Sequence, residues 1–85
     1  MIHARKDYTE RIQDAANLIP ADEPVFLIRA QDHISPDAVR AWALLHQRNG
    51  GSDVAYQLAM RHADLMEQWG KTHRTKAADV PPEAQ

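Results

Sequence analysis

The sequence predicts a small α+β protein that is mostly helical, with one short strand followed by a C-terminal helical hairpin. Three observations predict this fold class. The segment VFLIRA, which is β-branched and aromatic at its start, lies between Pro24 and Gln31, two later segments carry apolar residues at helical spacing, and an Asn-Gly-Gly turn separates them. The 85 residues, 44% hydrophobic and 26% charged, are typical of one folded domain.

The first element covers residues 7–19, and the pattern leaves its type open. The residues that share one helical face are Tyr8, Ile12, Ala15, Ala16 and Ile19. Pro20 would end such a helix. A short strand over residues 10–13 is the alternative, because Asp14 and Asn17 are poor residues for a helix interior.

The short strand is expected at residues 25–30. Phe26 and Ile28 fall on one face, and Val25 and Leu27 fall on the other, so both faces are apolar. Such a strand is buried or covered by a partner subunit. Its backbone also needs a second strand, from the N-terminal segment or from another copy of the chain.

Residues 36–49 and 53–69 are predicted to form the hairpin. Ser35 supplies a capping oxygen and Pro36 suits the first helical position, while the glycines at 50 and 51 end the first helix and Ser52 or Asp53 caps the second. The residues expected to face inward are Ala38, Val39, Trp42, Ala43, Leu45 and His46 in the first helix, and Val54, Leu58, Ala59, His62, Leu65, Met66 and Trp69 in the second.

Residues 1–70 are expected to form a single small domain, and residues 71–85 a flexible C-terminal tail, because the tail has no helical periodicity and two prolines. A domain of this size buries a thin core. Because the chain has no disulfides to add stability, self-association is expected to supply it, so we expect a homodimer or a higher oligomer.

Composition excludes several classes of protein. Without cysteine the chain has no disulfide scaffold, thiolate metal site or cysteine nucleophile, and a reducing compartment is permitted. The longest strongly apolar run, residues 25–28, is far too short to span a bilayer, and the start lacks the apolar region of a secretory signal. We therefore expect a cytoplasmic protein with no membrane partner.

A polar cluster follows the predicted strand. The candidate ligand-binding residues are Arg29, Gln31, Asp32 and His33, with Trp42 available to stack on a ring. The end of a strand beside a helix start suits an anion, and Arg29 adds a permanently charged fork. The alternative is a structural role, in which Arg29 pairs with a nearby acid and fixes the strand to its flanking turns.

Tyr56, Met60 and Arg61 are the predicted partner interface, because these residue types are enriched in interfaces. Nucleic acid is not expected as a partner: the net charge is -2, and Arg61 is the only Lys or Arg between Ser52 and Trp69. The five histidines are scattered and no catalytic or phosphate-loop motif is present, so we expect no metal, no cofactor and no enzymatic activity.

Residues 23–32, EPVFLIRAQD, followed by Pro36, Val39 and the Trp42-Ala43 pair, resemble a family of small proteins carried by bacteria and their phages and prophages. The resemblance covers residues 20–69. It implies a setting in which a small non-enzymatic protein binds a host protein and blocks it, for example as an anti-defence inhibitor. The alternative is an oligomer that sequesters an anionic nucleotide-type small molecule, held by Arg29.

Overall fold

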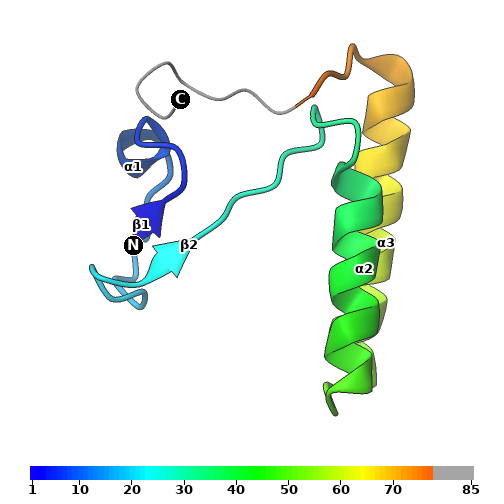
Figure 1. Cartoon of the computed structure of the whole chain (residues 1–85), viewed down its shortest axis with the longest axis horizontal. Helices are drawn as coiled ribbons and strands as arrows, with labels where there is room; N and C mark the ends of the chain where they lie inside the picture. Colours follow the sequence, from blue (N-terminus) through cyan, green and yellow to red (C-terminus); the bar gives the residue numbers. More distant parts are fainter. Residues whose placement is uncertain (78–85) are drawn as a thin grey trace. The chain divides into compact units, whose positions relative to one another are not determined.

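A computed structural model describes residues 1–77 and confirms a mixed, mostly helical α+β chain. It divides into two compact units, Met1–Leu27 and a second unit that begins at Ile28 (Figure 1). The boundary between the units falls inside the strand expected at residues 25–30, within the residues 1–70 expected to form one domain. Buried side chains occur in both units, Tyr8 in the first and Ala43, Ala63 and Met66 in the second.

The first unit is built on a two-stranded parallel sheet. Strand β1 (Ile2–His3) pairs with β2 (Pro24–Val25), in a register that places Ile2 beside Pro24 and His3 beside Val25. The N–H of Ile2 donates to the carbonyl of Glu23 at 2.8 Å. The N-terminal segment thus supplies the second strand, one of the two sources that the sequence left open.

Helix α1 (Tyr8–Arg11) is the only helical part of residues 7–19. Asp14 and Asn17 explain the early end. The Asp14 carboxylate accepts a hydrogen bond from the N–H of Ile19 at 2.6 Å, and the backbone carbonyl of Asp14 accepts one from the N–H of Asn17. Asn17 itself has a positive φ of 55°. These local bonds compete with a helix, and the left-handed residue breaks it.

The expected strand at residues 25–30 is shorter than predicted, because only Val25 of that range lies in β2. Residues 26–29 have no regular secondary structure and link the two units. Phe26 is 75% exposed, so the two apolar faces of this segment are not buried within the described chain. Cover by a partner subunit, the other option that the sequence left open, stays a prediction.

Charged side chains surround the small core of the first unit. Arg5 forms two hydrogen bonds to the Asp7 carboxylate at 2.9 and 2.7 Å, and Arg11 adds a third at 3.2 Å. Both guanidinium groups lie over the ring of Tyr8, at 4.6 and 5.3 Å from its centre. Asp7 thus offsets part of the repulsion between two cations that lie over one ring.

The hydrogen bond from Arg5 lowers the pKa of Asp7 below the ordinary aspartate value of 3.8. A carboxyl whose pKa is lower in the folded state contributes stability above its ordinary pKa, and that contribution is lost as the pH falls through the lowered value. We expect an NMR titration of the Asp7 carboxyl carbon to show a midpoint below 3.8. In the Arg5→Met variant the midpoint should return toward that value, and an unchanged midpoint would contradict this account.

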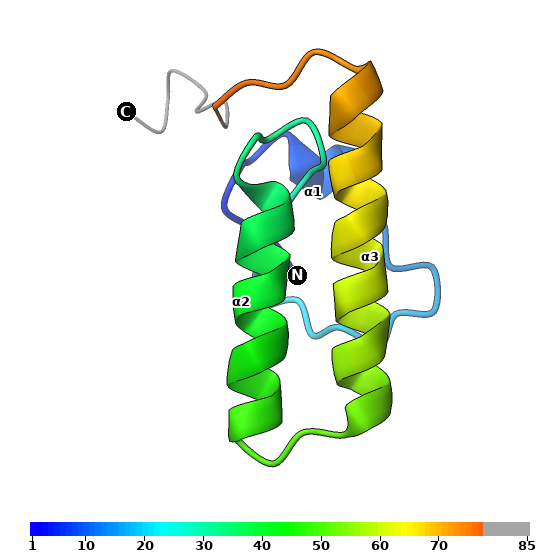
Figure 2. The ribbon, with the colours of Figure 1, turned by 90° about the vertical axis from the view of Figure 1, so that its right-hand side faces the viewer.

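The second unit is an antiparallel hairpin of two long helices, α2 (Ser35–Arg48) and α3 (Asp53–Thr72), which pack side by side (Figure 2). Gly50 ends α2 with a left-handed φ of 81°, which glycine adopts without steric cost. A Cβ atom on Gly51 would fall on the imidazole of His46, so a larger residue there would displace that side chain.

The two helices begin in different ways. The Ser52 hydroxyl caps α3 as predicted, accepting the N–H of Ala55 at 3.1 Å. Ser35 does not cap α2. It is the first helical residue after the Ile34 cap position, it is fully buried, and its hydroxyl has no hydrogen-bond partner among residues 1–77.

Helix α3 extends past its expected end at residue 69 to Thr72, and the chain then returns to the start of α2. The N–H of Lys76 donates to Gln31 at 2.9 Å, and the N–H of His33 donates to Lys76 at 3.0 Å. Part of the expected tail, up to residue 77, is therefore ordered as part of the second unit. Residues 78–85 of that tail lie outside the described residues. No helix among residues 1–77 is long and apolar enough to cross a membrane.

Candidate functional site

The seam between α2 and α3 buries fewer residues than the sequence predicts. Ala43 and Ala63 are fully buried and Met66 is nearly so. Most of the large side chains expected to face inward are exposed instead, with exposed fractions of 40–69%. They are Trp42, Leu45, Val54, Leu58, Leu65 and Trp69. Because two helices can cover only one seam, the rest of each apolar stripe faces outward.

These exposed residues lie on the parts of α2 and α3 that turn away from the seam. Leu45 is two residues from the buried Ala43, and Leu65 is two residues from the buried Ala63. A separation of two residues places side chains on roughly opposite sides of a helix with 3.6 residues per turn. We call these six exposed residues the apolar face.

Imidazole rings stack on the two tryptophans of the apolar face. The Trp42 ring stacks on His46 with 4.9 Å between centres, and the Trp69 ring stacks on His73 with 3.9 Å between centres. Trp42 remains 53% exposed in this arrangement. The face therefore presents flat aromatic surfaces as well as aliphatic ones, which is typical of interface cores.

The predicted interface residues do not form one surface. Tyr56 and Met60 are half-buried and share the side of α3 that carries Ala59 and Ala63. Arg61 is exposed and lies three residues after Leu58 and four residues before Leu65, so it shares their side of α3. Its Nε donates to the carbonyl of Gln57 at 3.4 Å. Of the three, Arg61 alone borders the apolar face.

The other side of the hairpin carries an ion cluster centred on Arg40. Its guanidinium donates to Asp64 at 2.9 Å and to Glu67 at 3.0 Å, so it joins the two helices. A third contact, to Asp37 at 3.4 Å, is long for a hydrogen bond. The bonds to Asp64 and then Glu67 raise the pKa of Arg40 above its ordinary value.

We expect Arg40→Met to lower the thermal unfolding midpoint of the hairpin, because two carboxylates three residues apart on α3 lose their shared cation. The loss should shrink at high salt, since the carboxylates are partly exposed and screened. Circular dichroism melts at low and high salt measure both effects. Arg48→Met, which removes an exposed arginine of the same helix outside the cluster, is the control, and equal losses in the two variants would contradict the assignment.

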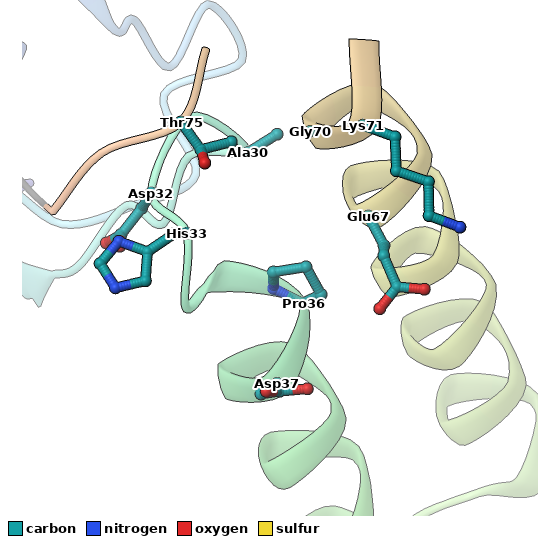
Figure 3. Close-up of a pocket in the computed structure, with 9 residues that line it drawn as sticks. All are labelled: Ala30, Asp32, His33, Pro36, Asp37, Glu67, Gly70, Lys71 and Thr75. Atoms are coloured by element: carbon teal, nitrogen blue, oxygen red, sulfur yellow. The ribbon is translucent and has the colours of Figure 1, made fainter. Parts of the chain in front are cut away.

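An open pocket of about 200 Å³ lies at the end of the hairpin where α2 begins (Figure 3). Asp32 and His33 come from the loop before α2, Asp37 from its first turn, and Glu67 and Lys71 from α3. The other lining residues are Ala30, Pro36, Gly70 and Thr75. Three carboxylates against one lysine give this pocket a charge balance that does not favour an anion.

The predicted ligand-binding residues are only partly brought together. Asp32 and His33 line the pocket, whereas Arg29, Gln31 and Trp42 do not. The carbonyl of Arg29 accepts the N–H of Asp32 at 3.0 Å, and that of Gln31 accepts the N–H of Lys76. Trp42 lies on α2 in the apolar face. The backbone of residues 29–33 thus forms a turn, while the side chains of Asp32 and His33 line the pocket.

The ionisable groups of residues 1–77 form no cluster of three or more His, Asp or Glu that could hold a metal ion. His46 packs against Trp42 and the Gly51 turn. His3 is buried against Tyr8 in the first unit, and neither ring nitrogen has a hydrogen-bond partner among the described residues.

The Arg40 cluster was not predicted from the sequence, although a signal for it exists. Asp64 and Glu67 are three residues apart and so share one face of α3. Two neighbouring carboxylates on one face indicate a cation on the adjacent helix. Arg40 sits on the corresponding side of α2.

Comparison of the chain with protein-family models, with curated proteins and with solved structures finds no match.

Proposed function

We propose that this protein is a non-enzymatic binding protein that contacts another polypeptide through the apolar face of its helical hairpin. One observation carries the proposal: six large apolar side chains on the two helices of the hairpin are 40–69% exposed. Folded monomers rarely expose contiguous apolar patches of more than a few hundred Å² unless the patch binds something.

Photo-crosslinking tests this function in the cell that expresses the protein. A benzophenone amino acid is placed at position 58, in the apolar face, and in a second variant at position 57, an exposed neighbour outside it. We expect polypeptide adducts chiefly from position 58. Comparable adducts from both positions, or none from position 58, would rule the proposed function out.

A second candidate function is the binding of a flat anionic molecule of nucleotide type by an oligomer. The exposed Trp42, stacked on His46, supports it, because a nucleobase can stack on such a surface. Arg29 is the proposed anion contact. Native mass spectrometry of the protein isolated from its host should then show a stoichiometric adduct of a few hundred daltons, and Arg29→Ala should remove the adduct while the oligomer persists. An oligomer without such an adduct excludes this candidate.

The proposed setting is the cytoplasm, a reducing compartment compatible with a chain that has no cysteine. A more specific form of the proposal is that the protein inhibits a host defence protein in a phage or prophage context. It is supported by the resemblance of residues 20–69 to small proteins carried by bacteria and their phages. In that form, the polypeptide crosslinked from position 58 would be a host protein.

A further inference from the structure

We propose that the peptide bond between Phe26 and Leu27 is a cleavage site for an endoprotease of chymotrypsin-like specificity. Both residues belong to the first unit and follow directly after β2, in a stretch without regular secondary structure. Figure 1 shows this stretch as an open trace without helix or arrow. Cleavage there does not involve the apolar face, and so goes beyond the proposed function.

The backbone of this stretch is available for pairing with a protease. An extended peptide that binds another protein as a strand does so through main-chain hydrogen bonds, and proteases bind their substrates in this way. Within residues 1–77, the backbone N–H and C=O groups of residues 26–28 form no hydrogen bond. A protease can therefore bind the stretch without breaking backbone bonds of the described chain.

Phe26 is the aromatic residue that such a protease can reach. A chymotrypsin-like enzyme selects a large apolar side chain before the scissile bond, because that side chain fills a hydrophobic slot. Phe26 is 75% exposed, so it is open to such a slot. The chain has five Phe, Trp and Tyr residues in total, and the other four lie in helices: Tyr8, Trp42, Tyr56 and Trp69.

The helices protect the other aromatic residues. Trp42, Tyr56 and Trp69 lie within α2 and α3, whose backbone groups are bonded along the helix. Tyr8 lies in the shorter α1 but is only 6% exposed. Cleavage at these positions requires local unfolding, and its rate then follows the small population of the opened state. Phe26 requires no such opening.

Leu18 is the strongest competing site, because it is 80% exposed, lies outside the helices and has a side chain that the same slot accepts. Its backbone is held in a turn. Asn17 before it is left-handed, and the N–H of Ile19 after it donates to the Asp14 carboxylate at 2.6 Å. A protease would have to open this turn before the Leu18–Ile19 bond could bind as a strand.

The reaction consumes only water. The bond between the Phe26 carbonyl carbon and the Leu27 nitrogen breaks, the carbonyl carbon gains a hydroxyl group, and the nitrogen gains a hydrogen atom. One product keeps β1, α1 and β2, and the other keeps α2 and α3. Cleavage thus cuts the covalent link between the two units without dividing any helix or strand.

Brief digestion of the full chain with chymotrypsin, followed by mass spectrometry of the intact products, tests the site. We expect the first products to be residues 1–26 and 27–85. Phe26→Ala should slow cleavage of this bond roughly 100-fold, since the loss of a single methylene group in a hydrophobic pocket already costs about 10-fold or more. Leu18→Ala, the matched control, removes another exposed apolar side chain and should leave the rate unchanged.

A second variant tests the backbone rather than the side chain. Leu27→Pro keeps the aromatic ring and should also block the cut, because proline fixes the backbone and lacks an N–H at the scissile bond. Circular dichroism checks that the three variants keep their helices, which we expect because residues 18, 26 and 27 lie outside them.

Three results would overturn the inference. The first is an initial cut at any bond other than Phe26–Leu27. The second is a Phe26→Ala variant that is cut at this bond as fast as the original chain. The third is resistance of this bond in the original chain, as cover by a partner subunit would give.

Discussion

Ala63→Leu is expected to destabilise the hairpin by about 1–3 kcal/mol, the usual cost of forcing extra methylene groups into a packed core. Ala63 is fully buried in α3, as Ala43 is in α2. These small residues let the helices approach closely, and a leucine in the seam must push them apart. Urea denaturation followed by circular dichroism measures the change in the free energy of unfolding.

The matched control for this variant is Ala41→Leu. It adds the same side chain to an exposed position of α2 and should change the free energy of unfolding by a few tenths of a kcal/mol at most. If Ala63→Leu is as harmless as Ala41→Leu, the seam described here is not the core of the hairpin.

Tyr8→Ala is expected to remove the order of the first unit while leaving the hairpin folded. Tyr8 is the buried aromatic residue of that unit, packed against His3 and under two guanidinium groups. Truncating a buried aromatic residue typically costs about 3–5 kcal/mol, which a core this small has no reserve to absorb. Amide NMR spectra should lose the dispersed signals of Met1–Leu27 and keep those of α2 and α3.

Tyr8→Phe is the control for this variant, since it keeps the ring that both arginines contact. It should retain the dispersed signals of the first unit. Loss of the hairpin signals in Tyr8→Ala would mean that the two units fold as one, contrary to their separate cores.

The helical hairpin could be predicted from the sequence because its signals are local. The Ser52 cap, the glycine turn and the apolar spacing each depend on neighbouring residues. The first unit was harder to predict. The Asp14 side chain and the left-handed Asn17 stop a helix that the apolar spacing of residues 7–19 favours. Pairing of β1 with β2 joins residues more than twenty positions apart, which no local pattern reveals.

The binding surface could be predicted only in part. Helical spacing correctly grouped Trp42 with Leu45 and Leu58 with Leu65, but it could not show that the hairpin offers only one seam to bury them. Tyr56 and Met60 were chosen by residue type, and the structure places them half-buried. Asp32 and His33 do line a pocket, yet the carboxylates beside them come from α2 and α3, which sequence proximity does not indicate.

The most direct test of a covered apolar face uses the absence of native cysteine. Single cysteines are placed at positions 58 and 57, both exposed on the hairpin, and the rate of thiol labelling is measured in the full chain. In an extract of the host cell the thiol at position 58 should react far more slowly than that at position 57, and purification away from other polypeptides should bring the two rates together. Equal rates in the extract would mean that the apolar face is open to solvent, and would contradict the account.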